Sequence, residues 1–101
     1  MAATMPEVRS RIECHQTLDY EHIRVLVEAY IYGTATPMRA LIHTLLIMRA
    51  GIEQGNTYQY RDEKGLLHTI DAGSLQAFIL QYFDDFTYRE VMGEDSCGMY
   101  S

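Results

Sequence analysis

The sequence lacks most of what a catalytic centre is built from. It has no glycine-rich phosphate-binding loop, and no serine stands in a recognised nucleophile motif. Its two cysteines, Cys14 and Cys97, are too few for a disulfide framework. We therefore predict a protein that is not an enzyme, with no catalytic residue and no cofactor.

The sequence is equally short of metal ligands at suitable spacing. Cys14, His15 and His22 offer three ligands, whereas a structural zinc ion takes four, usually from closely spaced pairs. The carboxylate pairs Asp84-Asp85 and Glu94-Asp95 lie in an acidic stretch, while general acid–base chemistry needs carboxylates held in a pocket. We predict no metal site and expect these carboxylates at the surface.

Long apolar runs are absent as well. The longest, over residues 45–48, is far shorter than the roughly 18 residues that a membrane span needs. Residues 1–15 contain no apolar stretch of the kind found in a signal peptide. We therefore expect a cytoplasmic protein with reduced thiols and no membrane association.

Basic residues are few, and they are unevenly distributed. The chain has 8 basic and 14 acidic residues, a net charge of −6, and Lys64 is its single lysine. Residues 1–51 hold five of each sign, whereas residues 52–101 hold three basic and nine acidic residues. A chain without a basic surplus is a poor candidate for binding nucleic-acid phosphates. The charge favours a protein partner with a basic surface.

The acidic half also carries an aromatic residue among its carboxylates. Carboxylates speed the encounter with a basic protein, and a tyrosine supplies contact area. Solubility alone would also explain the acidity, so both interpretations stay open. The predicted partner-binding residues are Asp84, Asp85, Tyr88, Glu90, Glu94 and Asp95.

What is present suffices for a folded core. The chain has 101 residues, the size of one domain, and 48% of them are hydrophobic. We expect a single domain over residues 1–101, with flexible tails at residues 1–6 and 93–101.

Three segments have apolar residues at the three- and four-residue steps of amphipathic helices. They span residues 18–32, 37–54 and 72–86, and we expect Asp71 to cap the third. The helix at 37–54 is apolar on so many sides that it should be the central element. Residues 87–90 have the form of a capping box, which predicts a break near Phe86 and a short C-terminal helix.

Residues 57–70 predict a β-hairpin, because two strand-like segments flank a turn that ends in Gly65. The expected register places Tyr60 opposite His68 and Tyr58 opposite Ile70. Residues 8–15 alternate between apolar and polar and predict a further strand. Val8 and Ile12 are also four residues apart, as in a short helix, so that alternative stays open.

Together these elements predict an α+β fold, in which a small antiparallel sheet packs against three main helices and a short C-terminal helix. The function that we expect is a non-enzymatic protein-binding module. By class-level analogy it would inhibit or antagonise a nucleic-acid-binding protein through its acidic, tyrosine-containing C-terminal surface.

Two other functions are consistent with the sequence. The helices at 18–32 and 37–54, joined by a short turn, suggest a helix-turn-helix DNA-binding regulator with Arg39 near the groove, although the second helix has little polar face. The same apolar helix suggests a structural subunit that buries its surplus apolar surface in a homodimer.

Overall fold

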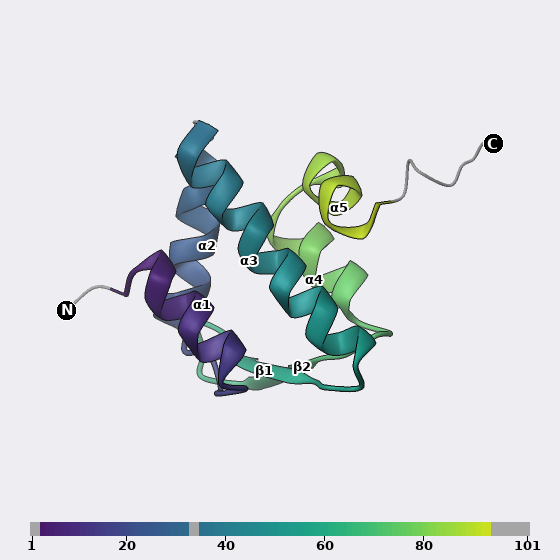
Figure 1. Cartoon of the computed structure of the whole chain (residues 1–101). Helices are drawn as coiled ribbons and strands as arrows, with labels where there is room; N and C mark the ends of the chain where they lie inside the picture. The colour runs from purple at the N-terminus through teal and green to yellow at the C-terminus, as the bar shows by residue number, and fades with distance from the viewer. Residues whose placement is uncertain (1–2, 33–34, 94–101) are drawn as a thin grey trace.

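The computed structural model describes residues 3–32 and 35–93, and over them it confirms the predicted α+β fold. This part of the chain forms five helices and one two-stranded antiparallel sheet. In Figure 1, α3 crosses the molecule with α1 and α2 on one side, α4 and α5 on the other, and the hairpin at one end. The elements are α1 (Met5–Glu13), α2 (Tyr20–Tyr32), α3 (Ala35–Glu53), β1 (Tyr58–Arg61), β2 (Leu67–Ile70), α4 (Leu75–Tyr82) and α5 (Asp85–Met92).

Helix α3 is the central element, as its apolar composition predicts. It contacts α1, α2 and α5, and Leu41, Leu45 and Met48 on its inner side are fully buried. Thr44 lies among them, and its hydroxyl donates a hydrogen bond to the backbone carbonyl of Ala40 at 2.8 Å. The helix therefore buries a polar side chain without leaving it unsatisfied.

The strand expected at residues 8–15 is wrong, because this segment belongs to α1. Val8 and Ile12 are both fully buried, whereas Ser10 and Cys14 are exposed. The buried positions therefore recur every four residues rather than every two. Thr4 caps the helix and accepts a hydrogen bond from the Glu7 amide at 3.4 Å. Since α1 begins at Met5, the tail expected at residues 1–6 extends too far into the chain.

Buried His22 joins α1 to the start of α2. Its Nδ1 accepts a hydrogen bond from the Asp19 backbone amide at 2.9 Å, so its Nε2 carries the proton that it donates to Glu7 Oε2 at 3.0 Å. This bond from His22 is the main reason why the pKa of Glu7 is lowered.

The helix expected at 18–32 starts later, at Tyr20, because Leu18 instead forms a parallel bridge to Tyr60 of β1.

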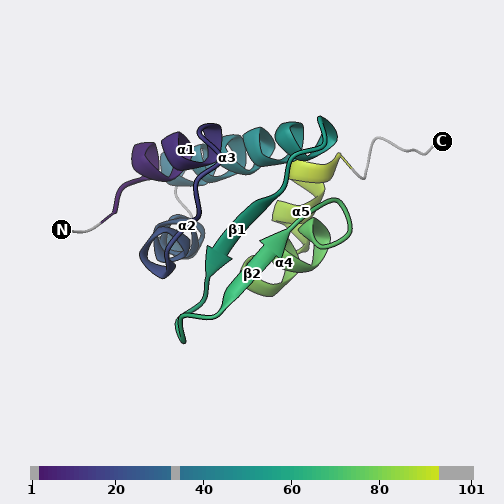
Figure 2. The same ribbon diagram turned by 90° about the horizontal axis from the view of Figure 1, so that it is seen from below.

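The hairpin has the predicted register. Tyr58 lies opposite Ile70 and Tyr60 opposite His68, and Gly65 closes the turn with a φ of +81°. Figure 2 shows α1 beside α3 and places α2 and the α4–α5 pair on either side of the hairpin.

Helix α3 starts at Ala35 and ends at Glu53, against a prediction of 37–54. Three helices, α1, α3 and α5, end on a residue with positive φ that follows the last turn, and for α5 this residue is Gly93, with a φ of +67°. After α3 this residue is Gly55, with a φ of +97°, and the Asn56 amide donates to the Gly51 carbonyl at 3.0 Å. After α1 it is His15, with a φ of +57°.

The helix expected at 72–86 is shorter, because the chain breaks at Phe83–Asp84 rather than near Phe86. Helix α4 lies within the expected range, and α5 is the predicted short C-terminal helix. Asp84 caps α5 and accepts a hydrogen bond from the Thr87 amide at 2.9 Å. Thr87 itself is buried inside α5, so it does not act as the predicted cap. Asp71 lies before α4, whose N-cap position is Ser74, but its carboxylate accepts hydrogen bonds from the amides of Gly73 and Ser74, both at 3.0 Å, in the turn that leads into the helix.

Candidate functional site

The predicted acidic site falls on α5, where two of its residues take part in folding. Asp84 is half-buried, and the amide of Thr87 together with the hydroxyl of Tyr30 lowers its pKa. Burial and the charge of Asp84 raise the pKa of Tyr30 in turn. Tyr88 is half-buried and packs against the hydrophobic core. Asp84 and Tyr88 therefore hold α5 in place.

The other predicted residues are more accessible. Asp85 forms an ion pair with Arg89 at 2.9 Å, and both side chains are exposed. Glu90 is exposed on the same helix. Glu94 and Asp95, like most of the tail expected at 93–101, lie outside the described residues. The structure thus gives α5 an exposed edge that carries the carboxylates of Asp85 and Glu90.

A groove lies elsewhere, along α2 and the hairpin turn. It consists of two adjoining hollows of about 290 Å³ and 320 Å³, and the side chains of Tyr20 and Tyr82 line both. Tyr20 opens α2 and Tyr82 ends α4, so the two tyrosines bring separate elements together. We call the hollow along α2 the apolar arm and the hollow at the hairpin turn the polar arm.

The apolar arm is lined by Ile23, Val27 and Ile31, which recur every four residues on one side of α2. Ile31 is 67% exposed, although it is a large aliphatic residue. Arg24 and Glu28 line the arm as well, and they form an ion pair at 3.6 Å. This end of the groove is therefore an aliphatic surface beside a charge pair that is already balanced.

The polar arm is organised by Asp62. One of its carboxylate oxygens accepts hydrogen bonds from the amides of Lys64 and Leu66, both at 2.9 Å. The other oxygen contacts His68 Nε2 at 2.8 Å, and this hydrogen bond is the main reason why the pKa of Asp62 is lowered. Asp62 therefore fixes the turn and orients the imidazole. The lining of this arm comprises Tyr20, Asp62, Glu63, Lys64, Leu66, His68, Gln81 and Tyr82.

An aromatic cluster supports the polar arm from inside. Tyr60 is 4% exposed, and its ring stacks on His68 with 5.0 Å between centroids. It also meets Phe78 at 5.1 Å and Tyr82 edge-on at 6.0 Å. Burial, followed by a hydrogen bond to Tyr82, raises the pKa of Tyr60. These contacts restrict the rings of His68 and Tyr82, so the wall of the groove is already formed.

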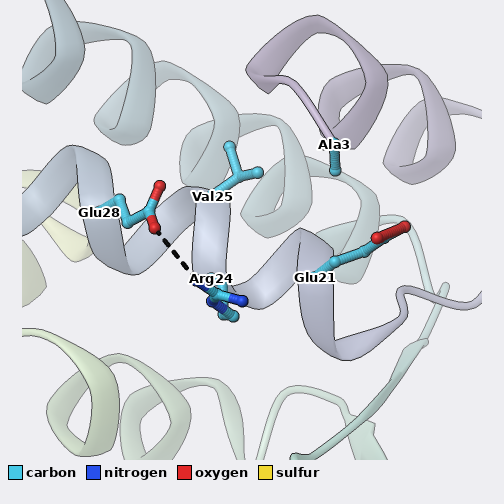
Figure 3. A pocket seen from close by; sticks show the side chains of 5 residues that line it. All are labelled: Ala3, Glu21, Arg24, Val25 and Glu28. Carbon is cyan, nitrogen blue, oxygen red and sulfur yellow. Dashed lines mark ion pairs between the residues drawn. The ribbon is translucent and has the colours of Figure 1, made fainter. Parts of the chain in front are cut away.

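Two other hollows lie outside the groove. Figure 3 shows one of about 130 Å³ on the outer side of α2, lined by Ala3, Glu21, Arg24, Val25 and Glu28, with its arginine already paired to Glu28. A second, of about 270 Å³, lies where the end of α1 meets α3, and there the His15 ring stacks on Tyr58 at 5.7 Å.

Within residues 3–32 and 35–93, no three His, Cys, Asp or Glu side chains gather in a way that would hold a metal ion. Among the helices described, none combines the length and apolar character that crossing a membrane requires.

Sequence reasoning missed the groove because its residues look like core residues. The amphipathic stripes that predict α2 and α4 include Ile23, Val27 and Tyr82. Such a stripe does not show which of its residues a neighbouring element covers in the fold and which stay exposed. The width of the stripe on α2 was a usable signal, because Ile31 extends it beyond what one packed face needs.

The chain was compared with known proteins at three levels. No protein-family model matches it, and the searches of curated proteins and of solved structures found no match either.

Proposed function

We propose that this protein is a non-enzymatic protein-binding module and that the groove along α2 receives a segment of a partner with a basic surface. The observation that carries the proposal is the pair of adjoining hollows that share Tyr20 and Tyr82. One hollow is aliphatic, the other is polar and acidic, and Tyr20 and Tyr82 line both of them. Interfaces are enriched in such tyrosines because they combine contact area with a polar tip.

The shape of the groove supports a protein segment as its ligand. Both hollows are open to solvent and lie side by side, so an elongated segment can occupy them together, with apolar and polar side chains at different points. The net charge of −6 supports a basic partner. An inhibitor or antagonist of a nucleic-acid-binding protein would have these properties, and the proposal keeps that role.

The proposal also keeps the cytoplasm as the location. Cys14 is a free and exposed thiol, and such thiols persist in reducing compartments.

The two alternative functions receive less support from the arrangement of α3. A recognition helix has to present a polar face to DNA, whereas α3 contacts three other helices and buries Leu41, Leu45 and Met48. The same contacts cover much of the apolar surface that suggested a homodimer through this helix, and Leu46 is the part of it that stays 38% exposed.

Affinity capture from a native lysate treated with nuclease tests the proposal, if the wild-type protein is compared with two variants. Ile31→Ser removes an exposed aliphatic side chain from the apolar arm, and Leu67→Ser removes one that is 48% exposed but does not line the groove. We expect one protein to be captured by the wild type and by Leu67→Ser and to be lost with Ile31→Ser. Equal capture by all three proteins would contradict the proposal.

A further inference from the structure

We propose that the polar arm of the groove receives an arginine side chain from the partner, with its guanidinium lying against Tyr20 and Tyr82 and facing the carboxylates of Asp62 and Glu63. This inference rests on the proposed function and specifies the chemistry of the partner. A suitable partner segment presents an arginine at one end and an aliphatic side chain for the apolar arm at the other.

The charges of the polar arm favour a cation. Asp62 and Glu63 contribute two carboxylates, against the single ammonium of Lys64. Among the described residues Glu63 has no ion pair or hydrogen bond, so its carboxylate is available to a ligand. Asp62 is occupied by the turn and by His68. Its Oδ1 already accepts two hydrogen bonds, but its Oδ2 contacts only His68 and can accept one more.

The rings of the polar arm favour arginine over lysine. A guanidinium is planar, stacks on aromatic faces and pairs with carboxylates through several N–H groups at once, whereas an ammonium is a compact and strongly hydrated charge. Tyr20 and Tyr82 supply the rings. Tyr82 is held against Tyr60 and Phe78, with centroids 6.0 Å and 5.3 Å away, so little ordering is needed on binding.

Lys64 competes for this position. Its side chain lines the polar arm and forms no ion pair among the described residues. Its ammonium therefore repels an incoming guanidinium and offers the carboxylates a weaker substitute. Removing the charge of Lys64 should therefore strengthen the binding of arginine, whereas removing the charge of Glu63 should weaken it.

The test uses N-acetyl-arginine methylamide as the probe and follows the amide signals of the full-length protein by NMR during titration. We expect saturable shifts at residues 62–68 and at Tyr82, with weaker binding of the lysine analogue and no such shifts with the neutral citrulline analogue. Glu63→Gln should weaken binding about two- to fivefold, the effect of one partly exposed ion pair, and Lys64→Gln should strengthen it by a similar factor. Glu13→Gln removes an exposed carboxylate outside the groove and should leave binding unchanged.

Equal binding of arginine and citrulline, equal binding of arginine and lysine, or shifts confined to other surfaces would overturn the inference. Its failure is distinguishable from failure of the proposed function. If Ile31→Ser abolishes partner capture while the arginine probe does not bind, the groove remains the partner site and only the arginine assignment is wrong.

Discussion

The two sides of α2 carry similar aliphatic residues but have different surroundings. On one side Leu26 and Ala29 are buried, at 0% and 7% exposure, where α2 meets α3. On the other side Val27 is half-buried and Ile31 is 67% exposed in the apolar arm. The same residue chemistry therefore stabilises the fold on one side and remains available to a partner on the other. The predictions below separate these roles, beginning with the covered side.

Leu26→Ala should have the largest effect. The leucine is fully buried in the core, so its truncation removes apolar contacts and leaves a cavity. We expect the free energy of unfolding to fall by about 2–5 kcal/mol, as measured by urea denaturation. A loss smaller than that of the exposed variant Ile31→Ser would show that the covered side is not part of the core.

Gly51→Ala should come next, on the covered side of α3. A Cβ at this position would overlap the hydroxyl of Tyr58 and lie 2.9 Å from its Cζ, and Tyr58 is 4% exposed. Alanine favours a helix by roughly 1 kcal/mol over glycine, but overpacking costs about 1–3 kcal/mol. We expect net destabilisation in thermal melts. The additional variant Tyr58→Phe, which removes the hydroxyl, should partly rescue Gly51→Ala.

Asp84→Ala should have an intermediate effect at the junction that joins α2 to α5. It removes the carboxylate that caps α5 and accepts the hydrogen bond from the Thr87 amide, which should cost about 1 kcal/mol. Because folding lowers the pKa of this carboxyl, its contribution is complete above its unfolded pKa of roughly 3.9 and is lost as the pH falls through the folded value. The acid side of a plot of stability against pH should therefore be flatter for Asp84→Ala than for the wild type. Parallel profiles would contradict this role.

Ile31→Ser should have the smallest effect on stability, within about 0.5 kcal/mol, because its side chain has few neighbours to lose. The measurement is the same urea denaturation used for Leu26→Ala. A large loss of stability would place Ile31 in the core and would remove the contrast between the two sides of α2.

The sequence predicted elements best where local geometry decides the structure. The hairpin register followed from the position of Gly65 in the turn, and the central place of α3 followed from its apolar width. Segment 8–15 was harder, because Val8, Ser10, Ile12 and Cys14 fit both periods, and only the packing of α1 against α2 and α3 selects the helix.

The break between α4 and α5 was misplaced for a related reason. Asp84 and Thr87 are both good capping residues, and the choice between them depends on tertiary contacts. Tyr30 and Phe83 meet edge-on at 5.7 Å, and the hydroxyl of Tyr30 contributes to the lowered pKa of Asp84. The candidate site was out of reach in the same way, because Tyr20 and Tyr82 are far apart in sequence and meet only in the folded chain.

The central claim is that the groove along α2 binds the partner, and an affinity measurement tests it most directly. The partner captured from lysate would be purified and titrated calorimetrically against the wild type, Ile31→Ser and Leu67→Ser. Burial of an isoleucine side chain contributes about 1.5–3 kcal/mol, so we expect Kd to rise on the order of tenfold or more for Ile31→Ser and to stay unchanged for Leu67→Ser. An unchanged Kd for Ile31→Ser in a normally folded protein would contradict the claim and place the binding surface elsewhere.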